Sequence, residues 1–279
     1  MSRITLSVII PTYNEEKSLG RTVNDLTIAL QKEKVPYEII LVNDNSSDTT
    51  PEIIKGLMDN NSNIKTINRK PPGGFGRAIR SGMELVSGEA VVICMADSSD
   101  DPLDVIKYYN KLEEGYDCVF GSRFIKGSSV ENYPVVKLLV NRIVNKIIQW
   151  LFWCKFNDLT NAFKAYRTEV IRSCGPYRAC HFNMTLELSL SALARKYSIC
   201  QVPINWYGRT WGSSNLSIRK MGRRYLVTLI KIYAEKVLIS DDLEAERLTI
   251  RRQNEINLEG INSRLELLEK KLLELEKDE

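Results

Sequence analysis

The sequence predicts an α/β fold with a mixed, mostly parallel sheet between helices, followed by C-terminal helices and a short coiled coil. Two observations predict the sheet. Short β-branched runs alternate with longer amphipathic segments over about the first 120 residues, and charged residues stand directly after several of these runs. The third observation is a change of composition at about residue 241, after which Glu, Lys, Arg and Leu dominate and predict a helical tail.

The expected strands and helices alternate along the chain. Strands are expected at residues 6–10, 37–42, 64–68, 90–95 and 118–121, with helices at 15–32, 49–58, 75–86 and 102–114. Sheets of this kind bind ligands at the carboxyl ends of their strands. Asp44, Arg69 and Asp97 each fall just past the end of an expected strand, so this edge of the sheet is the predicted functional site.

Composition narrows the class of protein. The 279 residues suffice for one sizeable core and an appendage, and a formal net charge of +4 is too small to indicate nucleic-acid binding. The six cysteines include no CxxC pair and His181 is the only histidine, which argues against a zinc site and for free thiols in a reducing compartment. The N-terminus has no signal-peptide pattern, and no run reaches the ~18–20 apolar residues of a membrane span, so a cytoplasmic location is expected.

Residues 134–153 are expected to form an amphipathic helix. Basic residues lie on its polar side, and the aromatic residues Trp150, Phe152 and Trp153 end it. Two interpretations remain open: the helix packs on the sheet, or it lies in a membrane interface with contact through 134–156. A second apolar helix, at about 225–239, also carries lysines.

The tail contains a heptad pattern. Leu258, Leu265 and Leu272 repeat every seven residues, and Ile261, Leu268 and Leu275 follow three residues after each of them. This is the a/d pattern of a coiled coil, so we predict a homo-oligomer formed through 258–275. Leucine at a with Ile or Leu at d favours states above the dimer, and a surface helix of one domain is the alternative.

Three motifs lie in the first half of the expected sheet. In SVIIPTYNEEKSL, Pro11 ends a strand before a helix. In ILVNDNSSDTT, Asp44 at a strand end can accept hydrogen bonds from a base or a ribose. In NRKPPGGFGRAIRSG, a glycine-rich turn near Arg69 enters a helix, an arrangement that suits an anion.

The motif VVICMADSSDDP carries the central prediction. A buried strand leads to Asp97, with Asp100 and Asp101 close behind. Carboxylates at a strand end suit Mg²⁺ or Mn²⁺, which prefer oxygen ligands and bridge phosphates. We therefore predict Asp97 as a metal ligand with Ser99 as an outer ligand. Asp100 and Asp101 either join them or cap the next helix, which begins with Pro102.

Further motifs lie downstream. In GSRFIKGSSVENYP, the planar guanidinium of Arg123 suits a phosphate, and a structural salt bridge is the alternative. The segment DLTNAFKAYRTEVI contains Arg167, and an R-x-x-G-x-S loop runs from Arg209 to Ser214.

In this order, the motifs resemble those of the family 2 glycosyltransferases, in particular the dolichol-phosphate mannosyltransferase-like branch. The resemblance covers about residues 5–220. It implies the GT-A fold, the Rossmann-like fold of nucleotide-diphospho-sugar transferases. It also implies an enzyme that uses Mg²⁺ or Mn²⁺ and a nucleotide-sugar donor.

The resemblance implies a role for each motif. It implies nucleotide contacts for Pro11, Tyr13, Glu15, Asp44 and Arg69, diphosphate contacts for Arg209 and Ser214, and acceptor contacts for Asn132, Lys137 and Arg167. Asp97, through its metal, and Arg123 and Arg209 would stabilise the leaving group. Four positions depart from the family pattern: Asn43 stands at the first of two aspartates, Met95 stands at the first aspartate of the DxD motif, Ala162 stands where a glycine is common, and Asn215 stands where a lysine is common.

The expected activity is inverting transfer of a hexose from a GDP-mannose or UDP-glucose type donor to a polyprenyl or dolichyl phosphate, at the cytoplasmic membrane face. One alternative is a soluble glycosyltransferase acting on a glycan, protein or small-molecule hydroxyl. Another is a catalytically silent nucleotide-sugar-binding scaffold. The expected organisation is a catalytic domain at 1–220, an amphipathic helix at 221–241 and an oligomerisation tail at 242–279.

Overall fold

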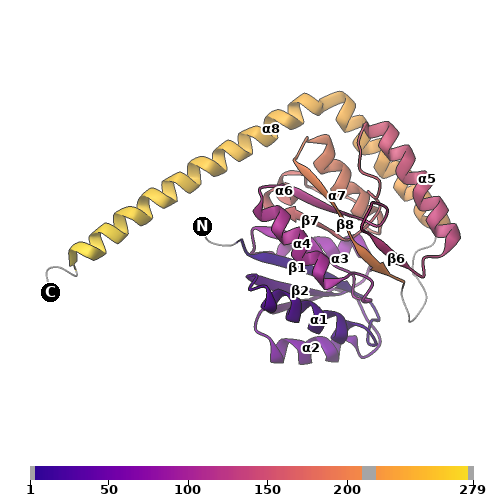
Figure 1. The fold of residues 1–279 in the computed structure, drawn as a ribbon, viewed down its shortest axis with the longest axis horizontal. Coiled ribbons are helices and arrows are strands. Elements are labelled where there is room, and N and C mark those ends of the chain that lie inside the picture. The colour runs from indigo at the N-terminus through magenta and orange to yellow at the C-terminus, as the bar shows by residue number, and fades with distance from the viewer. Residues whose placement is uncertain (1–3, 209–217, 276–279) are drawn as a thin grey trace.

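The computed structural model describes residues 4–208 and 218–275, and its centre is a seven-stranded sheet (Figure 1). The strand order is β3-β2-β1-β4-β7-β5-β8. The strands are β1 (Leu6–Thr12), β2 (Tyr37–Asn43), β3 (Ile64–Asn68), β4 (Ala90–Ile93), β5 (Cys118–Ser122), β7 (Lys164–Arg167) and β8 (Ile199–Pro203). Within this sheet β7 runs antiparallel to β4 and β5, and the other pairs are parallel. The predicted fold class is confirmed.

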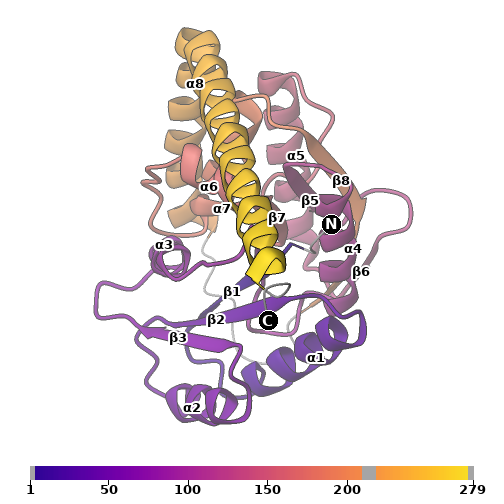
Figure 2. The same cartoon turned by 90° about the vertical axis from the view of Figure 1, so that its left-hand side faces the viewer.

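Helices cover both faces of the sheet (Figure 2). One face carries α1 (Leu19–Lys32), α2 (Thr50–Asn60) and α4 (Pro102–Glu113), and the other carries α3 (Phe75–Glu84), α5 (Val135–Phe152), α6 (Thr168–Ser173), α7 (Asn183–Ala194) and the start of α8 (Ile218–Leu275). A strand covered on both faces is apolar throughout, because successive side chains point to opposite faces. Accordingly Val8 packs in one hydrophobic cluster and Ile9 in the other.

Two expected boundaries near the carboxyl ends of the strands are different in the structure. The helix expected from residue 15 begins at Leu19, after a turn closed by the Glu15 carbonyl. The strand expected to reach residue 95 ends at Ile93, because the Met95 N–H donates to the Asp100 carboxylate at 2.9 Å. In both places an irregular polar loop stands where a helix or a strand was expected. The side chains of these loops can contribute to a ligand site.

Helix α5 corresponds to the helix predicted at 134–153. Its inner side packs on the body through Asn145, Ile148 and Phe152. Trp150 is 74% exposed, and Trp153, which directly follows the helix, is 90% exposed. One side of α5 therefore belongs to the core while apolar residues remain on its outer side. In the described part of the chain, every helix is too short or too polar to cross a membrane.

Helix α8 continues for 58 residues, with non-helical backbone at Ile239 (φ −135°, ψ 24°). The residues before this kink lie beside α7 and α5. Glu244 and Arg247, just after it, still contact Lys196, and the rest of the helix extends away from the sheet (Figure 1). The division predicted between 241 and 242 lies close to the kink. Of the predicted heptad side chains, that of Leu265 is described, and it is half exposed.

Candidate active site

The carboxyl ends of four strands lie at one edge of the sheet. Thr12 of β1 pairs with Asn43 of β2, which pairs with Asn68 of β3, and β4 ends beside β1. The loops that follow these strands contain Tyr13, Asp44, Arg69 and Asp97. The prediction that the last three residues follow strand ends is confirmed, and the structure brings their loops to a common edge.

Asp44 and Arg69 form an ion pair at this edge. Asp44 is buried, and its second oxygen accepts the Gly74 N–H at 2.6 Å. Arg69 is held in turn by the Ser81 hydroxyl at 3.0 Å. Gly74 has a φ of 147°, and a Cβ there would lie 2.4 Å from the Cys180 carbonyl oxygen, so a side chain could not be accommodated. The acidic loop and the glycine turn are therefore one rigid unit.

The loop after β1 is fastened to the loop after β2. The Asn14 side chain accepts the Ser47 N–H at 2.8 Å, and the Glu15 N–H donates to the Thr50 hydroxyl at 2.9 Å. Tyr13 is 48% exposed and Pro11 is partly buried. These bonds hold the predicted nucleotide contacts Pro11, Tyr13 and Glu15 close to the Asp44 loop. One ligand could therefore contact the loop after β1 and the loop after β2 together.

The three aspartates of the loop after β4 have different surroundings. Asp101 caps α4, because its carboxylate accepts the Leu103 N–H at 2.9 Å. Asp100 accepts the Met95 N–H, and burial raises its pKa to about 8, with the charge of Asp97 adding to the effect. Asp97 is partly exposed, and one oxygen accepts the Ser99 N–H at 3.1 Å. The capping interpretation is thus confirmed for Asp101, and Asp97 remains the predicted metal ligand.

The residues of this loop can contribute ligands to a metal ion that also binds substrate phosphate. Within residues 4–208 and 218–275, no three His, Cys, Asp or Glu side chains are arranged to hold a metal ion by themselves. Mg²⁺ commonly binds through one or two carboxylates together with substrate phosphates. The Asp97 carboxylate, with Ser99 beside it, fits that kind of site, whereas Met95 supplies no carboxylate.

Arg123 lies in a buried ion pair. Its guanidinium donates two bonds of 2.8 Å to Asp158, and its backbone N–H donates a third bond of 3.1 Å to the same carboxylate. Burial alone would lower the pKa of Arg123, but the Asp158 charge outweighs it and raises this pKa. The rings of Tyr133 and Trp206 lie 5.3 and 5.8 Å from the guanidinium carbon. The structural salt bridge considered from the sequence is therefore present.

Trp206 connects the Arg123 region to the aspartate loop. It belongs to β9 (Asn205–Tyr207), which pairs with β6 (Ser129–Glu131) in a small second sheet. The backbone of Trp206 also forms a bridge with Asp100, and its ring contacts Arg123 and Tyr133. The loop of Asp97 and the segment that contains the predicted acceptor contact Asn132 are thus neighbours. The sequence analysis did not single out Trp206, because only the strand pairing reveals its position.

The predicted acceptor residues do not all come together. Asn132 is exposed, and Lys137 lies partly buried in the first turn of α5. Arg167 pairs with Ala90 at the start of β4, which is the opposite edge of the sheet from Asp97. This position contradicts the acceptor-binding prediction for Arg167. The predicted diphosphate contacts Arg209 and Ser214 lie outside the described residues.

Lys164 is a buried charge that the sequence analysis missed. It is 1% exposed and donates to the carbonyls of Leu159 and Asn161 at 2.7 and 2.6 Å. Burial lowers its pKa to about 7. The signal that could have found it is a lysine within the apolar run Phe163 to Tyr166 of the DLTNAFKAYR motif.

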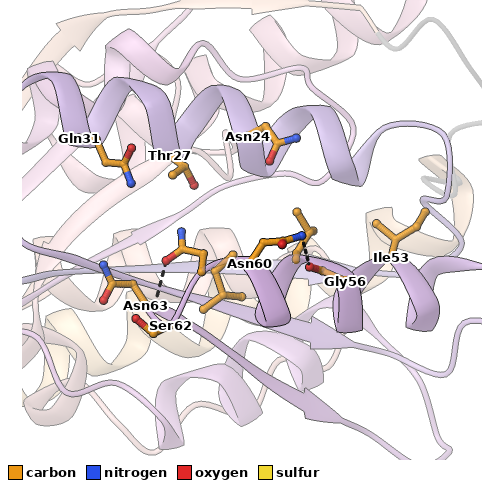
Figure 3. Close-up of a pocket in the computed structure, with 11 residues that line it drawn as sticks. Asn24, Thr27, Gln31, Ile53, Gly56, Asn60, Ser62 and Asn63 are labelled. Carbon is orange, nitrogen blue, oxygen red and sulfur yellow. Dashed lines mark hydrogen bonds between the residues drawn. The ribbon is translucent and has the colours of Figure 1, made fainter.

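A separate groove lies between α1 and α2 (Figure 3). Its lining is mostly uncharged and polar and includes Asn24, Thr27, Gln31 and Asn60. The segment that leads into β3, rather than out of it, forms one wall. The groove is therefore at the edge opposite Asp44 and contains none of the predicted site residues.

Comparison with known proteins identifies related sequences. Residues 7–175 match the family model for glycosyl transferase family 2. Polyprenol monophosphomannose synthase of Mycolicibacterium smegmatis is 28% identical over 75% of this chain and 80% of its own length. Dolichol-phosphate mannosyltransferase of Pyrococcus furiosus is 31% identical over 76% of this chain. The alignment covers 59% of that second relative, so the chain spans less than two thirds of its length.

Solved structures give the same fold. Glucosyl-3-phosphoglycerate synthase from Mycobacterium tuberculosis, in complex with Mn²⁺, uridine diphosphate and glucosyl-3-phosphoglycerate, superposes with a TM-score of 0.64. It is 21% identical, with 83% of this chain and 80% of that chain covered. The structure of a mycobacterial protein superposes with a TM-score of 0.66 at 18% identity, covering 83% of this chain and 75% of that chain.

Proposed function

The chain belongs to glycosyl transferase family 2 and has the GT-A fold of a glycosyltransferase, and we propose that it transfers a hexose from a nucleotide-sugar to a polyprenyl or dolichyl phosphate. The proposed donor is of the GDP-mannose or UDP-glucose type. Three relatives support the acceptor class, because their names include a polyprenol, a dolichol phosphate or an undecaprenyl phosphate. The proposed place of action is the cytoplasmic face of a membrane.

One observation carries the proposal: the Asp97 loop and the Arg123 region meet through Trp206 at the carboxyl edge of the sheet. A donor whose nucleoside lies by Asp44 and Arg69 would direct its diphosphate toward the Asp97 loop. An acceptor phosphate beside the first turn of α5 would approach from the other side. Donor and acceptor would then meet in one place, which is the requirement for direct group transfer.

The proposed mechanism is one displacement at the anomeric carbon. A phosphate monoester is already ionised at neutral pH, so the acceptor oxygen attacks without a strong general base. Asp97, with Ser99 beside it, would hold Mg²⁺ or Mn²⁺, which supplies positive charge to the departing diphosphate. Arg209 and Ser214 remain predicted diphosphate contacts. Arg123, already paired with Asp158, would act mainly by shaping the acceptor side of the site.

Helix α5 and the first part of α8 are proposed to contact the membrane surface. They lie side by side, with the Phe152 and Tyr233 rings 6.0 Å apart and the Lys236 amine donating to the Phe152 carbonyl at 2.8 Å. Residues 132–157 contain four basic and no acidic residues, and 218–240 contain six basic residues and one acidic residue. Exposed large apolar residues on these helices are Val135, Val136, Leu139, Ile143, Ile147, Trp150, Leu226, Val227, Ile230, Tyr233, Val237, Leu238 and Ile239. Apolar side chains among basic ones suit an anionic lipid surface.

A transfer assay with the purified full chain tests the reaction. GDP-mannose and UDP-glucose are each offered with a short isoprenoid phosphate or with the corresponding alcohol, in the presence of Mn²⁺. We expect product from the phosphate. In Asp97→Asn we expect kcat/KM to fall at least about 100-fold, since the loss of one charged metal ligand commonly costs several kcal/mol of transition-state stabilisation.

The control variant and the alternatives give distinct outcomes. Asp25→Asn removes an exposed carboxylate of α1 that pairs with Arg21, and it should behave as the wild type. Glycosylation of the alcohol or of a sugar hydroxyl would favour a hydroxyl-directed transferase. Binding of the donor without any turnover would favour a catalytically silent scaffold. The lack of a carboxylate at Met95 would then explain the lack of activity. Full activity of Asp97→Asn would remove Asp97 from the proposed metal site.

A further inference from the structure

The turn formed by residues 158–161 is buried, although it has no regular secondary structure. Asp158 is 1% exposed and Leu159 is fully buried. Buried backbone N–H and C=O groups require partners. In this turn the partners include side chains from different elements, among them Asn145 of α5 and Lys164 of β7. A loop supported in this way has little freedom to move independently of those elements.

The sheet supports the turn from one side. The Lys164 amine bonds to the carbonyls of Leu159 and Asn161, and it lies 5.1 Å from the centre of the Phe120 ring. Because Lys164 is part of β7, this contact fixes the turn relative to the central sheet. The turn can therefore serve as a fixed point for what its other residues bind.

Two amide side chains of helix α5 form hydrogen bonds with the same turn. The Asn145 oxygen accepts the Leu159 N–H at 2.6 Å, and its amide nitrogen donates to the Thr160 hydroxyl at 3.0 Å. The Asn141 amide donates to the same hydroxyl at 2.8 Å. Residues four apart lie on one side of a helix, so the two amides form one contact surface. The apolar residues proposed for lipid contact lie on other sides of α5.

Asp158 of the turn holds Arg123. The carboxylate receives both guanidinium bonds of 2.8 Å and the Arg123 N–H, while Tyr133 covers the guanidinium. Tyr133 directly precedes Pro134, the residue before α5. The turn is thus joined to α5 through Asn145 and to the segment before α5 through Asp158 and Arg123.

We infer that the turn at 158–161 couples α5 to Arg123 and that Asn145 is a positioning residue for the acceptor side of the site. The inference rests on the proposed function, in which α5 is the docking helix. When α5 is held on a lipid surface, the motion of the turn is restricted through Asn145, and Asp158 passes this restriction to Arg123. Seating of α5 on a lipid surface therefore orders residues 124–134, which connect Arg123 to α5 and include the predicted acceptor contact Asn132. The physical basis is one continuous hydrogen-bond network with buried members.

Amide hydrogen exchange on the full chain tests the coupling. It is measured with and without vesicles of equal parts phosphatidylglycerol and phosphatidylcholine. In the wild type, vesicles are expected to slow exchange in peptides covering 122–134 and 157–161 at least threefold. In Asn145→Ala, the chain is expected to float with vesicles as before, while this vesicle-dependent slowing disappears.

Matched variants separate coupling from general destabilisation. Gln149→Ala removes another α5 amide, whose bond is to the Lys155 carbonyl rather than to the turn, and it should retain the slowing. Thr160→Val removes the hydroxyl that both asparagines share and fills nearly the same volume, so it should also lose the slowing, even if Asn145→Ala fails to fold. In transfer assays, Asn145→Ala should raise KM for the isoprenoid phosphate about tenfold at unchanged donor KM.

The outcomes distinguish this inference from the proposed function. Slowing retained in Asn145→Ala, or in Thr160→Val if Asn145→Ala does not fold, would overturn the coupling. A wild-type chain that floats without any slowing at 122–134 would overturn it too, and so would a wild-type chain that does not float. A chain that floats and shows the coupling but transfers no sugar would refute the proposed reaction and leave the coupling standing.

Discussion

Lys137 and Arg167 were both predicted to bind the acceptor, but they have different surroundings in the structure. Lys137 lies in the first turn of α5, beside the segment that contains Tyr133. Arg167 donates to the carbonyls of Leu112 and Tyr116 at 2.7 and 3.3 Å, where α4 ends. A cation there satisfies the carbonyls that a helix end leaves unpaired and interacts well with the helix dipole. We therefore assign Arg167 to stability and keep Lys137 as the predicted acceptor contact.

Substitution of these two residues should separate the two roles. Lys137→Ala is expected to raise KM for the isoprenoid phosphate about tenfold, because a charged hydrogen bond to phosphate contributes about 1.5 kcal/mol or more. Arg167→Ala removes the same charge but should leave both KM values unchanged and lower Tm by a few degrees. Initial rates and thermal unfolding measure these effects. An equal rise of the acceptor KM in both variants would mean that net charge, rather than contact, binds the acceptor.

The sequence predicts side-chain chemistry better than side-chain partners. Its motifs located Asp44, Arg69 and Asp97 at strand ends, because strand ends follow from local hydrophobic patterns. The Arg123–Asp158 pair spans 35 residues and depends on the turn before β7 lying beside the end of β5, which no local pattern specifies. For the same reason, a cap and a metal ligand could not be told apart at Asp101 before its bond to Leu103 was known.

At the scale of elements, the sequence predicted the first five strands and the helices between them. Each of these elements is an apolar run or a regular amphipathic segment with a distinct end. It did not predict that β7 would insert antiparallel between β4 and β5, or that β6 and β9 would pair. These are short strands, and their pairing is decided by distant partners rather than by their own composition.

Helix α5 offers a test of the proposed membrane contact. Trp150 and Trp153 stand at its C-terminal end, close to Lys146 and Lys155 around a shallow hollow. Amphipathic aromatic rings beside basic residues prefer the headgroup region of a bilayer. Replacing both tryptophans with serine is expected to reduce flotation with anionic vesicles at least about tenfold, since each ring loses apolar burial worth about 1 kcal/mol or more.

The matched control for this experiment lies elsewhere on the surface. Ile28 of α1 is 62% exposed, but α1 covers the opposite face of the sheet from α5. Ile28→Ser should therefore leave flotation unchanged. Thermal unfolding would check that all variants are folded. Full flotation of the double tryptophan variant would show that α5 does not provide the contact, and the membrane proposal would then have to rest on α8 alone.

At the scale of the whole molecule, α8 joins two regions of different character. Before Ile239 the helix is basic and apolar and lies on the body. Just beyond it Leu243 is buried and both Glu244 and Arg247 bond to Lys196, so the helix still contacts the body there. Further on the helix is rich in Glu, Lys and Arg and leaves the body (Figure 1). The part of the helix beyond residue 247, which extends away from the body, depends on side-chain pairs or on a partner for stability. Its heptad pattern favours further copies of this chain as that partner.

Disruption of the heptad pattern should therefore change the mass in solution. Leu265 is 51% exposed in the single chain, so its side chain has apolar surface left to bury between copies. We expect the wild type to sediment above the 31.9 kDa of one chain and Leu265→Glu to shift toward that mass, because like charges would meet at a three-heptad seam. Gln253→Glu adds the same charge at an exposed position outside the seam and should keep the assembly. An unchanged mass in Leu265→Glu would assign any oligomer to the catalytic domain instead of the tail.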